Sequence, residues 1–172
     1  MVCLDCCKLV FLRRPLVGTV ADVTLQRWKR IALGYLAVVT GQIGLWALLA
    51  PRSFYDDFPG LGRAWVSVDG PYNEHLVRDV GALNLAILAV FVIAWLRLDR
   101  NSVTLAGVVA LVWGVPHASY HVVNTDGLGS GDLVASLLGL GLFALLGAGL
   151  LWAARRSDEP TADAVAATTV AS

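Results

Sequence analysis

Residues 133–154 read LVASLLGLGLFALLGAGLLWAA, a run of 22 residues without Asp, Glu, Lys or Arg. An α-helix rises about 1.5 Å per residue, so this run is long enough to cross a hydrocarbon layer of about 30 Å. Lipid cannot satisfy exposed backbone polar groups, so a segment that spans a bilayer alone must be helical. The run therefore predicts a transmembrane helix.

Three further uncharged runs of spanning length precede it, at residues 31–50, 80–96 and 103–123. The chain has 172 residues, of which 57% are hydrophobic and 15% charged, and its mean hydropathy is +0.68. It is too apolar for an ordinary soluble domain. We predict an all-α integral membrane protein, with a four-transmembrane-helix bundle in residues 31–154 and a long structured outer loop between its first two helices. Residues 1–30 form a cytoplasmic tail and juxtamembrane segment, and residues 155–172 a disordered cytoplasmic tail.

The basic residues predict the orientation of the bundle. Ten of the thirteen Lys and Arg residues precede the first run, separate the second from the third, or follow the fourth. By the positive-inside rule both termini are cytoplasmic, which predicts a multi-pass protein of the cytoplasmic membrane. Residues 51–79 and 124–132 then lie outside. A basic cytoplasmic face follows from topology and anionic lipid, so we expect no nucleic-acid partner.

The three cysteines, Cys3, Cys6 and Cys7, lie in the predicted cytoplasmic tail. Thiols are normally kept reduced there, so structural disulfides are not expected. One C-x-x-C without a second pair is a weak metal-binding pattern. We therefore expect no essential role for these thiols.

Amide side chains interrupt two of the runs. Gln42 lies near the middle of the first, and Asn84 lies within the second. A buried amide that finds no partner in lipid costs about 1–2 kcal/mol. We therefore expect both amides to face the bundle interior.

The outer segment 51–78 has the composition of an ordered cap. Turn-forming pairs occur at Pro59-Gly60 and Gly70-Pro71. Between and around them lie large apolar side chains, namely Phe54, Tyr55, Phe58, Trp65, Val66 and Tyr72. We predict that these rings face the lipid headgroups while the acidic residues face water.

The second run is preceded by Glu74-His75-x-x-Arg78-Asp79. In a helix this spacing pairs Glu74 with Arg78, and His75 with Asp79, at i, i+4. Two readings stay open. The pairs either stabilise a helix start at the interface, or they take part in ligand or proton handling.

The third run ends in Pro116-His117-Ala118-Ser119-Tyr120-His121. His117 and His121 share a helical face, so two imidazoles can point at one ion, and His75 is a third candidate metal ligand. Pro116 predicts a kink. Ionisable residues inside a membrane are functional candidates. A metal or haem site, ligand or proton handling, and structural hydrogen bonding all remain open.

Several common chemistries find no support in the sequence. H-E-x-x-H, G-x-S-x-G, a phosphate-binding glycine loop and a dinucleotide fingerprint are all lacking. No acidic or basic residue falls within a run, so a proton relay across the whole bilayer is not expected.

The runs 54–60, 70–82 and 116–121 together resemble a group of four-span membrane proteins of high-GC actinobacteria for which no activity is assigned. The resemblance covers roughly residues 31–154 and implies an inner-membrane location. Four short spans with an outward polar site also look like the DoxX-like membrane proteins, at the level of the fold only.

The residue pattern predicts a polar pocket at the outer face that binds a metal, a haem or a small ligand. Its candidate residues are His75, Asp79, His117, Tyr120, His121, Glu74, Arg78 and Asn84. The alternative is a non-enzymatic accessory or assembly subunit that docks through the aromatic cap. Expected partners are the lipid bilayer and either another membrane protein or a second copy of the chain.

Overall fold

The computed structural model describes residues 20–156. Its elements are α1 (Val20–Leu49), α2 (Pro51–Asp57), β1 (Pro59–Gly60), β2 (Arg63–Ala64), a 3-10 helix η1 (Ser67–Asp69), α3 (Glu74–Arg97), α4 (Arg100–Val123) and α5 (Ser130–Arg156). The cysteines and residues 157–172 of the predicted disordered tail lie outside this range, so the predictions about them stay predictions. Arg155 and Arg156, which were predicted to belong to that tail, are instead the last residues of α5.

Four helices, α1, α3, α4 and α5, are each long and apolar enough to cross a membrane. They contain the four uncharged runs, so the prediction of four spanning-length helices is confirmed. The first helix begins earlier than expected, at Val20, and therefore includes most of the predicted juxtamembrane segment. This extension has a packing reason, because the Trp28 ring lies over Gly149 of α5, where a Cβ would come within 2.7 Å of it.

Local capping explains the tight connection between α3 and α4. Leu98 ends α3 in the left-handed conformation, with φ of 54°, and its N–H donates to the Ala94 carbonyl. The next residue, Asp99, caps α4, and its carboxylate accepts from the Ser102 N–H at 3.0 Å. Two residues are therefore enough to reverse the chain.

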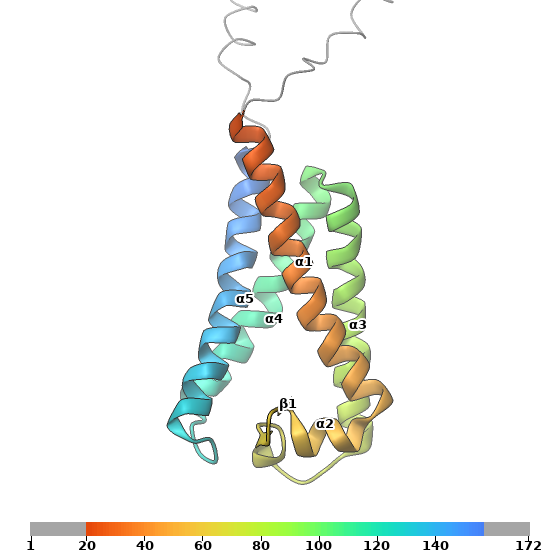
Figure 1. Cartoon of the computed structure of the whole chain (residues 1–172), viewed down its shortest axis with the longest axis vertical. Helices are drawn as coiled ribbons and strands as arrows, with labels where there is room; N and C mark the ends of the chain where they lie inside the picture. The colour runs from red at the N-terminus through yellow and green to blue at the C-terminus, as the bar shows by residue number, and fades with distance from the viewer. Residues whose placement is uncertain (1–19, 157–172) are drawn as a thin grey trace, which may run out of the picture.

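The long helices pack as two pairs, α1 with α3 and α4 with α5. Glycines permit the close approach. A Cβ on Gly81 would come within 2.6 Å of the Leu48 backbone nitrogen, and one on Gly107 within 2.9 Å of the Gly147 carbonyl oxygen. The pairs lie close together at the end where Val20 and Arg156 lie, and they diverge toward the end that carries α2 (Figure 1).

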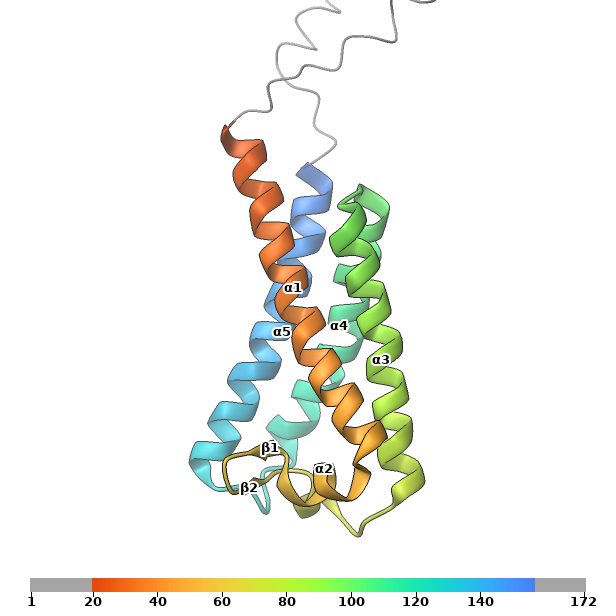
Figure 2. The ribbon, with the colours of Figure 1, turned by 45° about the vertical axis from the view of Figure 1, so that its right-hand side comes forward.

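An aromatic layer joins the two pairs in the middle of the bundle. Phe91 of α3 contacts Phe143 of α5, with ring centroids 5.9 Å apart, and Phe143 contacts Trp113 of α4 at 4.9 Å. Residues 51–73, here called the cap, cross between the diverging ends of the helices (Figure 2). The cap therefore lies over the part of the bundle where the pairs are furthest apart.

The two amides inside the runs differ in their placement. Asn84 is buried in α3, as expected. The expectation for Gln42 is wrong, because its side chain is exposed on α1. Gln42 follows the buried Thr40 by two residues, which is about 200° around a helix of 3.6 residues per turn, so it lies opposite the face that packs in the bundle.

Candidate functional site

The cap is fixed to the α1/α3 pair by aromatic packing. Trp46 near the end of α1 contacts Phe54 of α2 at 5.9 Å between ring centroids, and Phe54 contacts Phe58 at 4.8 Å. Phe58 in turn contacts Trp65, which follows β2, at 6.1 Å. These ring contacts connect the end of α1 with the cap as far as Trp65.

On its other side the cap is attached to the start of α5. The indole Nε1 of Trp65 donates to the Asp132 carboxylate at 2.9 Å, and the Arg63 guanidinium pairs with the same oxygen. In the sequence, Asp132 is recognisable only as the last residue of the predicted outer segment 124–132. Nothing in the spacing could have found this contact, because it joins residues 67 positions apart.

The two histidines of α4 lie side by side near the end of the bundle that carries the cap. The His117 and His121 rings are stacked, with centroids 5.1 Å apart and an interplanar angle of 29°. The Trp113 ring lies 4.7 Å from His117 on the side of the aromatic layer, and the Tyr120 ring lies 5.5 Å from His121. The predicted grouping of His117, Tyr120 and His121 on one helix end is therefore present.

His121 carries the most unusual feature of this group. The residue is only 8% exposed, and its Nδ1 atom is buried without a hydrogen-bond partner among the residues that the structure describes. Buried polar atoms are nearly always paired, because a lone one loses the full free energy of its hydration. An unpaired imidazole nitrogen in this position has an unused lone pair or N–H group.

Asn84 of α3, in the other helix pair, also has a buried side-chain atom without a partner. Its Nδ2 donates to the Val80 carbonyl at 2.9 Å, while its Oδ1 is buried without a partner in the described part of the chain. Asn84 lies two turns, about 10 Å, from Phe91, and His121 lies about 12 Å from Trp113. Both unpaired atoms are therefore on the cap side of the aromatic layer.

The electrostatic environment of His117 is dominated by burial and by the neighbouring His121, and the Asp69 carboxylate at the end of η1 makes a smaller contribution. Asp69 was not among the predicted site residues, since a loop carboxylate gives no spacing signal toward a helix 48 residues away in the sequence.

Four of the remaining predicted residues form two side-chain pairs at the start of α3. Arg78 Nε donates to Glu74 at 2.9 Å, and His75 Nε2 lies 3.3 Å from Asp79, as the i, i+4 spacing predicts. The His75 side chain is 88% exposed. Asn73 caps this helix, and its side chain accepts from the Leu76 N–H. This local geometry is that of a stabilised helix start.

The structure does not gather the three histidines into one ligand set. Within residues 20–156 no group of three or more His, Cys, Asp or Glu side chains is arranged to hold a metal ion. His117 and His121 are the two histidines that lie side by side.

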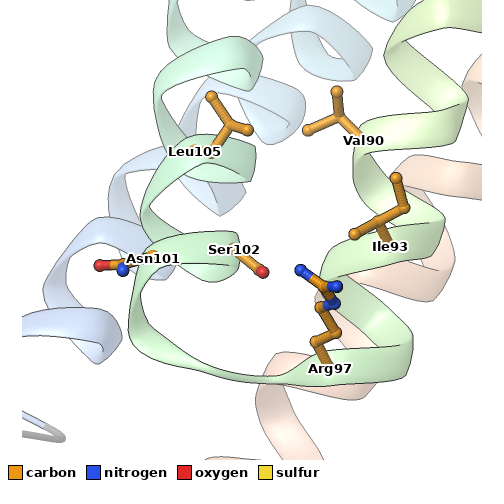
Figure 3. Close-up of a pocket in the computed structure, with 6 residues that line it drawn as sticks. All are labelled: Val90, Ile93, Arg97, Asn101, Ser102 and Leu105. Atoms are coloured by element: carbon orange, nitrogen blue, oxygen red, sulfur yellow. The ribbon is translucent and has the colours of Figure 1, made fainter.

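A groove of about 220 Å³ lies between α3 and α4 at the opposite end of the bundle. Figure 3 shows its six lining residues, Val90, Ile93, Arg97, Asn101, Ser102 and Leu105. The side chains of Val90, Ile93 and Leu105 are aliphatic, and the Arg97 side chain extends toward Ser102. None of these six residues is a His, Cys, Asp or Glu, and the Ser102 hydroxyl donates to the Asp99 carboxylate at 2.6 Å, so we do not assign the chemistry of the protein to this groove.

Comparisons of the chain with protein families, curated proteins and solved structures find no match. The resemblance to the actinobacterial four-span group therefore stays a prediction, as does the fold-level likeness to DoxX-like proteins.

Proposed function

We propose that this chain is a multi-pass protein of the cytoplasmic membrane, with the cap outside and both termini in the cytoplasm. Four spanning-length helices support insertion. Arg97 and Arg100 flank the short α3–α4 connection, and α5 ends in Arg155 and Arg156, which is the charge pattern of cytoplasmic ends.

We propose further that the outer end of α4, beneath the cap, binds a metal ion, a haem or another small ligand. The observation that carries this proposal is the buried, unpaired Nδ1 of His121 next to the stacked ring of His117. A ligand that coordinates or hydrogen-bonds this nitrogen would remove the free-energy cost of leaving it unpaired. Intramembrane histidines with such an unmet requirement are typical of binding sites.

Each neighbour of the histidine pair has a defined part in this proposal. Trp113 holds the His117 ring against the aromatic layer, which fixes one side of the site. Tyr120, whose ring edge contacts His121, supplies a hydroxyl for a hydrogen bond to a bound ligand.

The test compares wild-type protein, purified in mild detergent, with a His117→Ala, His121→Ala variant. We expect wild type to contain a near-stoichiometric metal, a Soret band or a small molecule detectable by native mass spectrometry. The double variant should lose it while keeping its helicity. His75→Ala is the matched control, because its imidazole is exposed to solvent and lies beside Asp79 at the start of α3, and it should retain the ligand.

Two results would contradict the proposal. Wild-type protein that carries no metal, chromophore or small molecule has no ligand at this site. Equal loss of ligand from His75→Ala and from the double variant would show that the α4 histidines do not bind it specifically.

A second candidate function is docking of a partner protein through the cap. Leu61, at the turn between β1 and β2, is 100% exposed, and the backbone around it is fixed by the strand pairing. Leu61 is therefore available for an apolar contact with a partner protein. A Leu61→Ser variant that loses a copurifying subunit but keeps its bound ligand would favour this function.

A further inference from the structure

The exposed face of α1 carries a regular stripe of side chains. Its members follow one another at alternating steps of four and three residues, and they are Ile31, Tyr35, Val38, Gln42, Leu45 and Leu49, all exposed. Side chains at this spacing lie along one line of a helix, the pattern by which two helices pack lengthwise. α1 buries its opposite face against α3 and α5, so the stripe faces away from the bundle.

Gln42 distinguishes this stripe from an ordinary lipid-facing surface. It lies less than two residues, or about 2 Å along the axis, from the midpoint of the uncharged run 31–50. Its amide has two N–H donors and one carbonyl acceptor, and it makes no hydrogen bond to another described residue. In hydrocarbon such a group has no water to bind, so it favours a partner helix.

We propose that α1 forms a homodimer through this stripe, with the Gln42 amides of two copies hydrogen-bonded to each other. This inference rests on the membrane insertion proposed above. Two copies inserted in the same direction are related by a two-fold axis along the bilayer normal, which places each residue of the stripe opposite itself. An amide is its own hydrogen-bonding complement, so a second copy satisfies Gln42 without any other partner.

The remaining stripe residues fit such an interface. Val38 and Leu45 lie one turn on either side of Gln42 and are aliphatic, so they supply apolar packing around the amide pair. A polar residue in an otherwise apolar seam also fixes the register of two helices, because any slip would leave both amides unpaired. The interface uses an exposed face of α1, whereas the proposed ligand site is formed by His117 and His121 of α4, so ligand binding and dimerisation are separable.

Cysteine cross-linking in native membranes tests the geometry. The background carries Cys3→Ser, Cys6→Ser and Cys7→Ser. A disulfide requires Cα atoms within about 7 Å, so Val38→Cys and Leu45→Cys should give covalent dimers on mild oxidation. Leu138→Cys is the control, because this leucine is equally lipid-exposed but belongs to α5. No cross-link at positions 38 and 45, or equal cross-linking at position 138, would overturn the proposal.

The role of the amide is tested by dimer dissociation in detergent, measured by light scattering over a dilution series. Gln42→Leu should raise the dissociation constant roughly tenfold or more, tenfold being equivalent to about 1.4 kcal/mol. Gln42→Asn keeps an amide and should keep the dimer. A wild-type monomer at all concentrations, or a Gln42→Leu dimer as tight as wild type, would overturn the proposal, and a monomer would point to a different protein as the partner of Gln42.

A carbonate wash of the membranes separates this inference from the proposal beneath it. Wild-type protein released by the wash is not inserted, and both proposals fail. Protein that stays in the membrane as a monomer overturns the dimer alone.

Discussion

Replacing Gly81 with alanine tests the close packing of α1 against α3. The new Cβ would lie 2.6 Å from the Leu48 backbone nitrogen and 3.0 Å from the Gly44 carbonyl oxygen. Ordinary contact begins at 3.4 Å, so the helices must separate by about 0.8 Å (3.4 minus 2.6). The obstructing atoms are backbone, which cannot turn aside as a flexible side chain can. Overpacking of this kind costs about 1–3 kcal/mol.

Alanine also gains about 1 kcal/mol over glycine in a helix interior, so a control must carry the same gain. Gly139 of α5 is suitable, because a Cβ there meets nothing within 4 Å. We expect Gly139→Ala to be neutral or stabilising, and Gly81→Ala to be less stable than Gly139→Ala by about 1–3 kcal/mol.

The assay is thermal unfolding in mild detergent, followed by the loss of helical circular dichroism. For a chain of this size 1 kcal/mol corresponds to about 2–4 °C in the midpoint, so the two variants should differ by several degrees. If Gly81→Ala unfolds at the same temperature as Gly139→Ala or above it, the close approach of α1 and α3 at this point is wrong.

Two further predictions concern contacts outside the helix cores. Asp132→Asn removes the charge that Arg63 pairs with and weakens the acceptor of Trp65, so amide hydrogen exchange in the cap should become faster while exchange in the four long helices is unchanged. Hydrogen bonds from the Ser102 hydroxyl and N–H hold the pKa of Asp99 below its ordinary value of 3.8. A carboxyl with a lowered folded-state pKa stabilises the fold above its unfolded value and loses that contribution as the pH falls through the folded value. Between pH 5 and about pH 3, wild type should therefore lose more stability than Asp99→Asn, which keeps a capping oxygen that does not titrate; parallel pH profiles of the unfolding midpoint would contradict this.

Part of the candidate site was predictable because its residues are close in sequence. The grouping of His117, Tyr120 and His121 follows from helical spacing alone, as does the pairing of His75 with Asp79. Contacts between distant segments leave no such pattern. The Asp132 contact with Trp65 and the effect of Asp69 on His117 both depend on how the cap crosses the bundle.

The sequence by itself determined the number and approximate bounds of the spanning-length helices, because long uncharged runs have few ways to satisfy their backbone groups. Only the tertiary structure decided which helices pair. Many glycines are available in α1 and α5, but the close contacts form at Gly44 with Gly81 and at Gly107 with Gly147. The tertiary structure also decided that the Gln42 side chain faces away from the bundle. Spacing places Gln42 on a helix face, but the packing of α1 against α3 and α5 determines which face is buried, and Gln42 lies on the other one.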